Sequence, residues 1–158
     1  MAADVKGFTL IELLVTLAIV ALLSTITLPL AQVAVQRQKE QQLRQALQEI
    51  RAALDLYQRA SAEGRISSPP DSSGYPPSLA AMVDGVKDQR SAGARKLYFL
   101  RSVPRDPFCG DPTLTDEQCW APRSYQSDPN EPKPGTDVYD VHSRSEQVGL
   151  NGIPYRRW

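Results

Sequence analysis

Residues 7–23 read GFTLIELLVTLAIVALL, and this stretch decides the fold. It opens an apolar run that continues to Leu30, and about 20 apolar residues are enough for a helix to cross the hydrocarbon core of a bilayer. Glu12 is the only ionisable side chain between Phe8 and Leu30. An acid at the centre of a membrane helix costs about 2.5–3.5 kcal/mol, and less near the interface. The stretch therefore predicts a membrane helix whose single acid has a function.

A cleaved secretory signal would be the ordinary explanation of an apolar N-terminus. Here Lys6 and the terminal amine are opposed by Asp4, and the apolar run exceeds the usual h-region of about 7–15 residues. No small-x-small site ends the run before the polar sequence begins. We therefore expect no conventional cleavage, while a plain uncleaved signal anchor explains the hydrophobicity but not Glu12.

The residues around Gly7 resemble the prepilin signature of type IV pilins and type II secretion pseudopilins. Lys6 and Gly7 are followed by the sequence FTLIE, residues 8–12. The resemblance implies a leader peptide over residues 1–7, cleavage between Gly7 and Phe8 by a prepilin peptidase, and N-methylation of Phe8. It also implies an assembly role for Glu12, at the fifth mature position, and a helix kink at Pro29.

The chemistry of Glu12 suits that assembly role. Cleavage would expose the amine of Phe8, and a carboxylate on a neighbouring helix would pair with it, so that each charge offsets the desolvation of the other. The alternative is that Glu12 extends to the cytoplasmic interface of a monomeric anchor.

The helix is expected to continue out of the membrane over residues 31–63. Residues 31–62 contain no Gly or Pro, and good helix formers predominate there. Apolar residues recur at steps of three and four and make one stripe, which consists of Leu43, Ala46, Leu47, Ile50, Ala53, Leu54 and Tyr57. The stripe predicts a packed sheet or loops on this face, since a coiled coil would require more than about two heptads.

Residues 64–158 are expected to form a loop-rich globular domain, because most of the 13 prolines follow Ser68. Within residues 71–93, which we interpret as a connecting region, residues 76–83 predict a short helix. Alternation predicts strands over residues 123–127 and 137–143, with a possible edge strand over 154–158. The predicted fold class is α+β: a long N-terminal helix with a small antiparallel sheet packed on its second half, as in pilins.

Residues 96–108 read KLYFLRSVPRDPF and resemble the segment that joins helix and sheet in major pseudopilins of type II secretion. Pro104 and Pro107 stiffen a turn that Phe108 would anchor in the core. For Arg105 and Asp106 we favour an ion pair that fixes the turn over a role as ligands.

Cys109 and Cys119 are expected to form a disulfide, because the domain is predicted to lie outside the cytoplasm. The alternative is a tetrahedral zinc site. Such a site requires four ligands, and the chain has only these two cysteines and one histidine.

Neither catalysis nor a resident metal is predicted. In a strand, Asp140 and His142 share one face while Ser143 points away, so these three do not form a triad. Major pseudopilins often hold calcium in the C-terminal loop, but this loop offers Ser143, Ser145, Glu146 and Asn151 without an aspartate. Calcium binding is left open, and we assign no ligands and no cofactor.

The 18 basic and 18 acidic residues cancel, which argues against a nucleic-acid partner. The resemblance implies a single-pass inner-membrane protein with a periplasmic domain, which polymerises with copies of itself and minor pseudopilins on an assembly platform to drive protein export. The alternatives are a type IV pilin of a surface fibre for adhesion, motility or DNA uptake, or a signal-anchored periplasmic binding protein or enzyme.

Overall fold

The computed structural model describes residues 7–91, 93 and 95–158, and for residues 25–29 it describes the backbone alone. The chain divides into two units, Met1–Gln38 and Lys39–Trp158. Of the expected leader peptide, only Gly7 lies within the described residues.

Helix α1 spans Leu10–Ala62 and ends in a glycine cap. Gly64 has φ +69°, a left-handed conformation that glycine adopts without strain. The amide of Gly64 donates to the carbonyl of Ser61, and that of Arg65 donates to the carbonyl of Ala60, both at 2.9 Å. These two bonds form a Schellman motif, which satisfies carbonyls that the helix end leaves unpaired.

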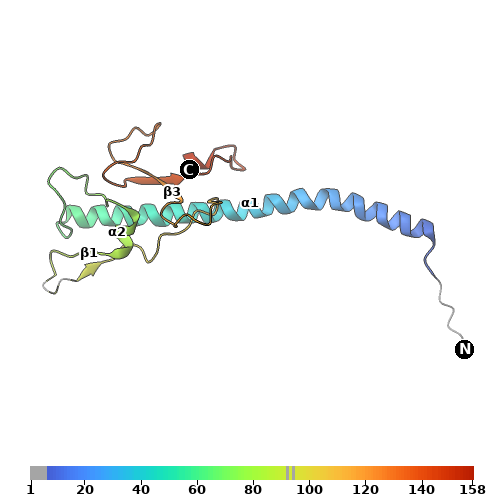
Figure 1. Cartoon of the computed structure of the whole chain (residues 1–158), viewed down its shortest axis with the longest axis horizontal. Coiled ribbons are helices and arrows are strands. Elements are labelled where there is room, and N and C mark those ends of the chain that lie inside the picture. Colours follow the sequence, from blue (N-terminus) through green and yellow to red (C-terminus); the bar gives the residue numbers. More distant parts are fainter. Residues whose placement is uncertain (1–6, 92, 94) are drawn as a thin grey trace, which may run out of the picture. The chain divides into compact units, whose positions relative to one another are not determined.

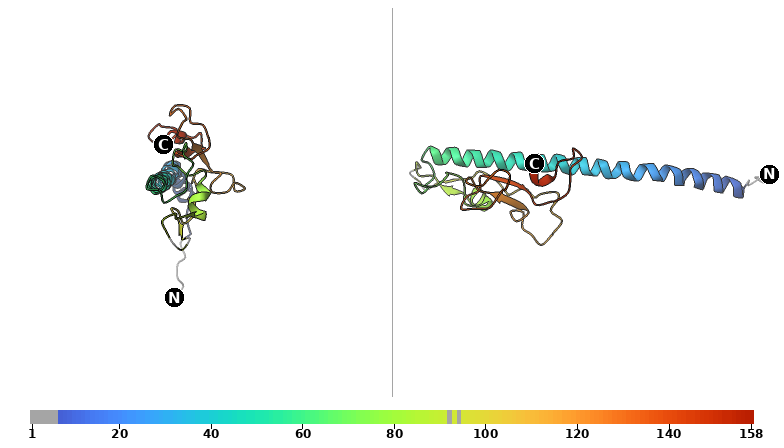
Figure 2. Two further views of the ribbon diagram at one scale, coloured as in Figure 1. Left: turned by 90° about the vertical axis from the view of Figure 1, so that its left-hand side faces the viewer. Right: turned by 90° about the horizontal axis from the view of Figure 1, so that it is seen from above.

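The core of the second unit forms on the predicted stripe of α1. All seven stripe residues are buried, which confirms the prediction. They pack with residues from the rest of the unit, which include Leu79, Met82, Trp120, Val141 and Tyr155. Full burial of one large apolar side chain contributes about 1.5–3 kcal/mol. Figures 1 and 2 show α2 and the strands alongside this second half of α1.

Strands β3 (Trp120–Arg123) and β4 (Asp140–Ser143) pair antiparallel, with Trp120 opposite Ser143 and Arg123 opposite Asp140. The predicted strand over residues 123–127 is therefore placed too late, and the one over 137–143 starts too early. Ser124 leaves the ladder because its amide donates to the carbonyl of Lys133, and Ser127 then closes a turn on Ser124.

Helix α2 and a second small sheet lie between α1 and β3 in the sequence. Strands β1 (Val86–Lys87) and β2 (Lys96–Leu97) pair antiparallel, so residues 71–93 are not only a connection. Helix α2 spans Leu79–Asp84, close to the predicted 76–83, and Ser78 caps it by accepting from the amide of Ala81.

Residues 154–158 do not form the expected edge strand. Pro154 makes an isolated bridge with Val148, and Tyr155–Arg157 then form the 3-10 helix η1. The ring of Tyr155 is buried against α1 and stacks on Phe108, with centroids 4.0 Å apart. The α+β fold with small antiparallel sheets on a long N-terminal helix is confirmed.

Candidate functional site

The first turn of α1 is organised by Thr9 and Glu12. The Thr9 hydroxyl accepts a hydrogen bond from the amide of Glu12 at 3.3 Å, and the Thr9 carbonyl accepts from Leu13 at 3.1 Å. A Thr followed three residues later by a Glu is the spacing of a capping box. This local role was not predicted from the sequence, although residues 9–12, TLIE, carry the signal for it.

Glu12 is an exposed acid at the N-terminal end of a helix. The positive end of the helix dipole favours a carboxylate there. None of the ion pairs between described residues includes Glu12.

Gly7 precedes the helix, and nothing in the fold of the described chain requires a glycine there. A side-chain carbon at this position would meet no atom within 4 Å, and Gly7 is not among the glycines with positive φ. Phe8, which follows it, is 85% exposed. Neither packing nor backbone geometry explains Gly7.

The N-terminal part of α1 exposes its apolar side chains all round. More than half of each side chain is exposed at Leu10, Ile11, Leu13, Leu14, Val15, Leu17, Ile19, Val20, Leu22 and Leu23. The Thr16 and Ser24 hydroxyls donate back to helix carbonyls at 2.9 and 2.8 Å, so that these polar groups are satisfied within the helix. An apolar surface of this extent marks a contact with other chains or lipid.

Among the described residues, no helix combines the length and hydropathy needed to cross a membrane. Pro29 lies within the bounds of α1, but its side chain is outside the described residues, so the kink stays a prediction.

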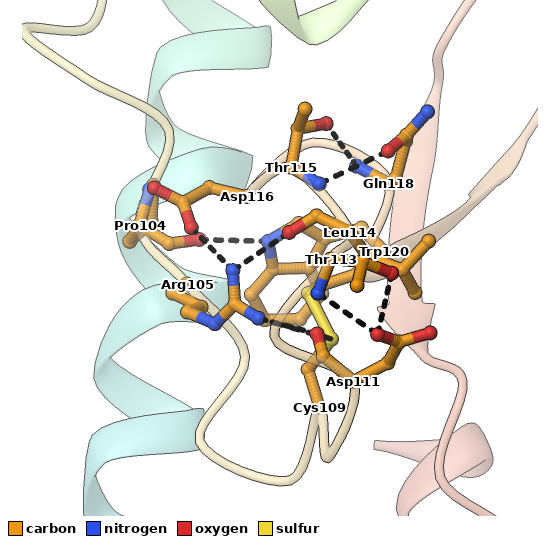
Figure 3. A network of polar contacts seen from close by, with 11 residues as sticks. Pro104, Arg105, Cys109, Asp111, Thr113, Leu114, Thr115, Asp116, Gln118 and Trp120 are labelled. Atoms are coloured by element: carbon orange, nitrogen blue, oxygen red, sulfur yellow. Dashed lines mark hydrogen bonds and ion pairs between the residues drawn. A yellow bond between two sulfur atoms is a disulfide. The ribbon is translucent and has the colours of Figure 1, made fainter.

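In the second unit, Arg105 holds together the loop that Cys109 and Cys119 close by a disulfide (Figure 3). Its guanidinium donates to the Leu114 carbonyl and the Asp116 carboxylate at 2.9 Å each, and to the Asp111 carbonyl at 2.7 Å. The same loop contains an Asx turn, because Asp111 accepts from the hydroxyl and amide of Thr113. These hydrogen bonds lower the pKa of Asp111.

The prediction of an ion pair between Arg105 and Asp106 is wrong. Asp106 is buried and accepts from the Ser143 hydroxyl at 2.6 Å and the Phe108 amide at 2.8 Å. A residue before proline favours an extended backbone, in which neighbouring side chains point to opposite sides. Arg105 therefore faces the disulfide loop while Asp106 enters the core.

The C-terminal loop is fastened to α1 by Glu40. This buried carboxylate accepts from the Leu150 amide at 2.7 Å and the Tyr155 hydroxyl at 3.0 Å. From the sequence we expect Glu40 on the exposed polar surface of the helix, and this prediction is wrong, because Glu40 is buried with two donors from the C-terminal loop. No local pattern separates it from its exposed neighbours. Of the residues considered for calcium, Ser143 bonds to Asp106 and Asn151 accepts from the amide of Ile153. The described residues contain no group of three or more His, Cys, Asp or Glu that would hold a metal.

Asp140, His142 and Ser143 do not converge on one another. Asp140 pairs with Arg51 at 2.8 Å, the His142 ring contacts the Ser143 carbonyl, and the Ser143 hydroxyl is turned into the core. As expected from strand alternation, Ser143 lies on the opposite face of β4 from Asp140 and His142.

Comparison with protein families matches residues 3–28 to the prokaryotic N-terminal methylation motif. Comparisons with curated proteins and with solved structures give no match. The chain thus carries the processing motif of the type IV pilin and pseudopilin superfamily on a pilin-like fold. Proteins with this motif are normally structural subunits, processed by a prepilin peptidase and then polymerised.

Proposed function

We propose that this chain is a structural subunit of a type II secretion-like pseudopilus, which polymerises from the bacterial inner membrane and drives protein export. The observation that carries the proposal is the exposed apolar surface of α1, which follows Gly7 and has one acid, Glu12, in its first turn. Such a surface needs lipid before assembly and other helices after it. A plain signal anchor on an enzyme would account for the apolar surface but not for Glu12.

The proposed processing follows from the N-terminal residues. A prepilin peptidase cleaves after Gly7, removes residues 1–7 and leaves Phe8 as the N-terminal residue, which is then methylated. Within the described residues, neither packing nor backbone geometry accounts for Gly7, and we assign this glycine to recognition by the peptidase. The high exposure of Phe8, at 85%, supports this assignment.

In the proposed filament, the carboxylate of Glu12 pairs with the methylated amine of Phe8 on the next subunit. The two groups carry opposite charges and lie one turn apart along the chain. Pairing between copies offsets the cost of holding each charge in an apolar surrounding and fixes the stagger between them. Residues 8–30 then form the membrane and assembly segment, and the disulfide-bearing domain lies in the periplasm.

The choice of a pseudopilus over a surface fibre rests on residues 96–108. These residues resemble the segment that joins helix and sheet in major pseudopilins, and here the segment contacts both strands of one sheet: the Pro104 carbonyl accepts from the Trp120 indole of β3 at 2.8 Å, and Asp106 bonds to Ser143 of β4. Further copies, minor pseudopilins and an inner-membrane assembly platform are the proposed partners. A type IV pilin of a surface fibre is the competing outcome of the test.

The test is complementation of a deletion strain with wild type, Gly7→Asp, Glu12→Ala and the control Glu49→Ala, which changes an exposed acid of the second unit. We expect Gly7→Asp to block cleavage, seen by mass spectrometry of the N-terminus. Glu12→Ala should be cleaved and inserted but form few filaments by electron microscopy. Both should abolish secretion, measured as exported protein in the medium, while Glu49→Ala should behave as wild type.

Normal filaments with Glu12→Ala would refute the assembly role of this acid. If the deletion strain exports protein normally but lacks surface fibres, the chain is a subunit of a type IV pilus and not of a pseudopilus.

A further inference from the structure

Residues 148–153 form a loop that presents apolar side chains to solvent. Val148, Leu150 and Ile153 are each between 44% and 52% exposed. In the second unit, the described residues with large hydrophobic side chains that are exposed are Leu56, Tyr98, Tyr125, Val148, Leu150 and Ile153. Half of these six therefore lie within one short loop, and packing inside the unit does not explain them.

The backbone of this loop holds it in one shape. The amide of Gly149 donates to the carbonyl of Ile153 at 3.0 Å, and the amide of Gly152 donates to the carbonyl of Gly149 at 2.9 Å. Gly149 packs so closely on Trp158 that a side-chain carbon at this position would lie 2.7 Å from the indole. The apolar side chains thus project from a preformed loop, and binding a partner there requires little ordering of the chain.

The loop is attached at the N-terminal edge of the second unit. Glu40, which accepts from the Leu150 amide at 2.7 Å, is the second residue of that unit. In the sequence, Glu40 follows Leu30, the last residue of the proposed membrane segment, by ten positions. Ten residues of α-helix rise only about 15 Å. The attachment point of the loop therefore lies close, along the chain, to the proposed membrane segment.

Arginine side chains lie beside the exposed apolar residues. Ile153 lines a pocket of about 300 Å³ together with Arg44, Arg157 and Trp158, and none of the described residues in this lining is acidic. The Arg44 guanidinium lies 4.6 Å from the centre of the Trp158 ring, and the Trp158 indole donates to the Ile153 carbonyl at 3.2 Å. Residues 144–157 contain three arginines and one acid, Glu146. The surface therefore combines apolar side chains with a positive charge.

We propose that this loop, with Arg44 and Arg157, docks on the surface of a bilayer that contains anionic lipids. Val148, Leu150 and Ile153 enter the interfacial region, and the two arginines pair with lipid phosphates. Tryptophan is enriched at the same depth, which suits the place of Trp158 between them. A bilayer is favoured over a second copy of the chain because it offers apolar depth and negative charge together, close to the attachment point of the loop.

This inference rests on the proposed membrane segment, residues 8–30, and adds a second membrane contact to it. The segment anchors the chain, whereas the loop holds the second unit against the bilayer before the subunit enters a filament. Each arginine near an anionic surface strengthens such a contact about fivefold. Docking should therefore depend on the charge of the lipids, which insertion of an apolar helix does not require.

The test places one copy of the full chain in a phospholipid nanodisc, so that no second copy can cover the loop. A few lipids carry a gadolinium chelate on the headgroup, and NMR measures the relaxation enhancement of methyl groups. In discs of equal parts phosphatidylcholine and phosphatidylglycerol, we expect strong enhancement at Leu150 and Ile153. Leu56, a comparably exposed residue of α1, is the control and should show little. In discs of phosphatidylcholine alone, the enhancement at the loop should fall at least about twofold.

Two double variants separate docking from mere proximity to the bilayer, with the Val148 methyl groups as the reporter. Arg44→Gln with Arg157→Gln removes the charges, and Leu150→Glu with Ile153→Glu removes the apolar contact. Both should lower the enhancement at Val148 in the anionic discs to its value in neutral discs, while the control Arg59→Gln should leave it unchanged. All the replaced side chains are exposed, so the melting temperature of the second unit should stay that of the wild type.

Equal enhancement at the loop in neutral and anionic discs would overturn the inference, as would wild-type enhancement in both double variants. Enhancement that is absent with one copy per disc, together with protection of the loop once two copies share a disc, would also overturn it and make this surface a contact between subunits. A chain that does not insert into the discs at all would refute the proposed membrane segment instead, so the two failures are distinguishable.

Discussion

The hydroxyl of Ser143 donates a 2.6 Å hydrogen bond to the carboxylate of Asp106, 37 residues earlier in the chain, and both side chains are buried. Asp106 also accepts from the amide of Phe108. The bond joins the proline turn to the last residue of β4, and it thereby positions the sheet against the segment that precedes the disulfide loop.

Asp106→Ala should destabilise the second unit by about 2–4 kcal/mol, because it leaves the buried Ser143 hydroxyl and the part-buried Phe108 amide without an acceptor. Urea unfolding followed by tryptophan fluorescence measures the change. The control Asp128→Ala removes an acid from an exposed turn and should cost less than about 1 kcal/mol. Equal effects of the two substitutions would contradict a special role for the Asp106–Ser143 bond.

Glu40→Ala should release the C-terminal loop. The substitution removes the acceptor of the Leu150 amide and the Tyr155 hydroxyl, at a cost of about 2–3 kcal/mol. Hydrogen exchange at Leu150 should accelerate, whereas exchange in β3 should change less. Glu49→Ala, an exposed acid on the same helix, is the matched control, and an unchanged Leu150 exchange rate in Glu40→Ala would count against the contact.

Arg105 and the disulfide should act as two restraints on one loop. Replacing both cysteines by serine should cost about 2–3 kcal/mol from the ten-residue separation. Arg105→Ala should cost about 1 kcal/mol, because its guanidinium is partly exposed. The variant that combines these substitutions should lose about 0.5 kcal/mol more stability than the sum of the two separate losses. The reason is that either restraint alone still limits the loop, whereas the combined variant has neither.

A double-mutant cycle by chemical denaturation measures this coupling. Arg101→Ala, an exposed arginine just before the turn, should show no coupling to the cysteines. Strict additivity for Arg105 would mean that its contacts and the disulfide restrain different parts of the chain.

Asp88 should make the second unit sensitive to acid. The Arg65 guanidinium bonds to Asp88 at 2.8 Å and holds the pKa of that carboxyl below its ordinary value of 3.8. A carboxyl with a lowered folded pKa contributes stability that is present above pH 3.8 and is lost as the pH falls through the folded pKa. NMR titration of the Asp88 carboxyl and unfolding below pH 3.8 measure both effects.

Arg65→Gln should raise the pKa of Asp88 toward its ordinary value and reduce the loss of stability in acid. Arg59→Gln, which changes the basic residue in the last turn of α1, is the control and should leave the Asp88 titration as it is. An unshifted Asp88 titration in Arg65→Gln would show that the ion pair does not set this pKa.

Sequence alone determined the features that depend on local patterns. The motif at residues 7–12, the long helix and its apolar stripe follow from neighbours a few positions apart, because helical periodicity repeats every 3.6 residues. The short helix after Pro77 follows from its proline and serine start signals. Each of these elements could be predicted because the residues that cause it lie within one or two turns of one another.

Only the tertiary structure decided which polar side chains are buried and where the strands begin. Glu40 reaches Tyr155, Arg51 reaches Asp140 and Asp106 reaches Ser143 across long stretches of chain. No local pattern encodes such pairs, since a carboxylate enters the core only where a distant donor meets it. Short strands are likewise set by their partners, so β3 ends where Ser124 bonds to Lys133 rather than where the alternation ends.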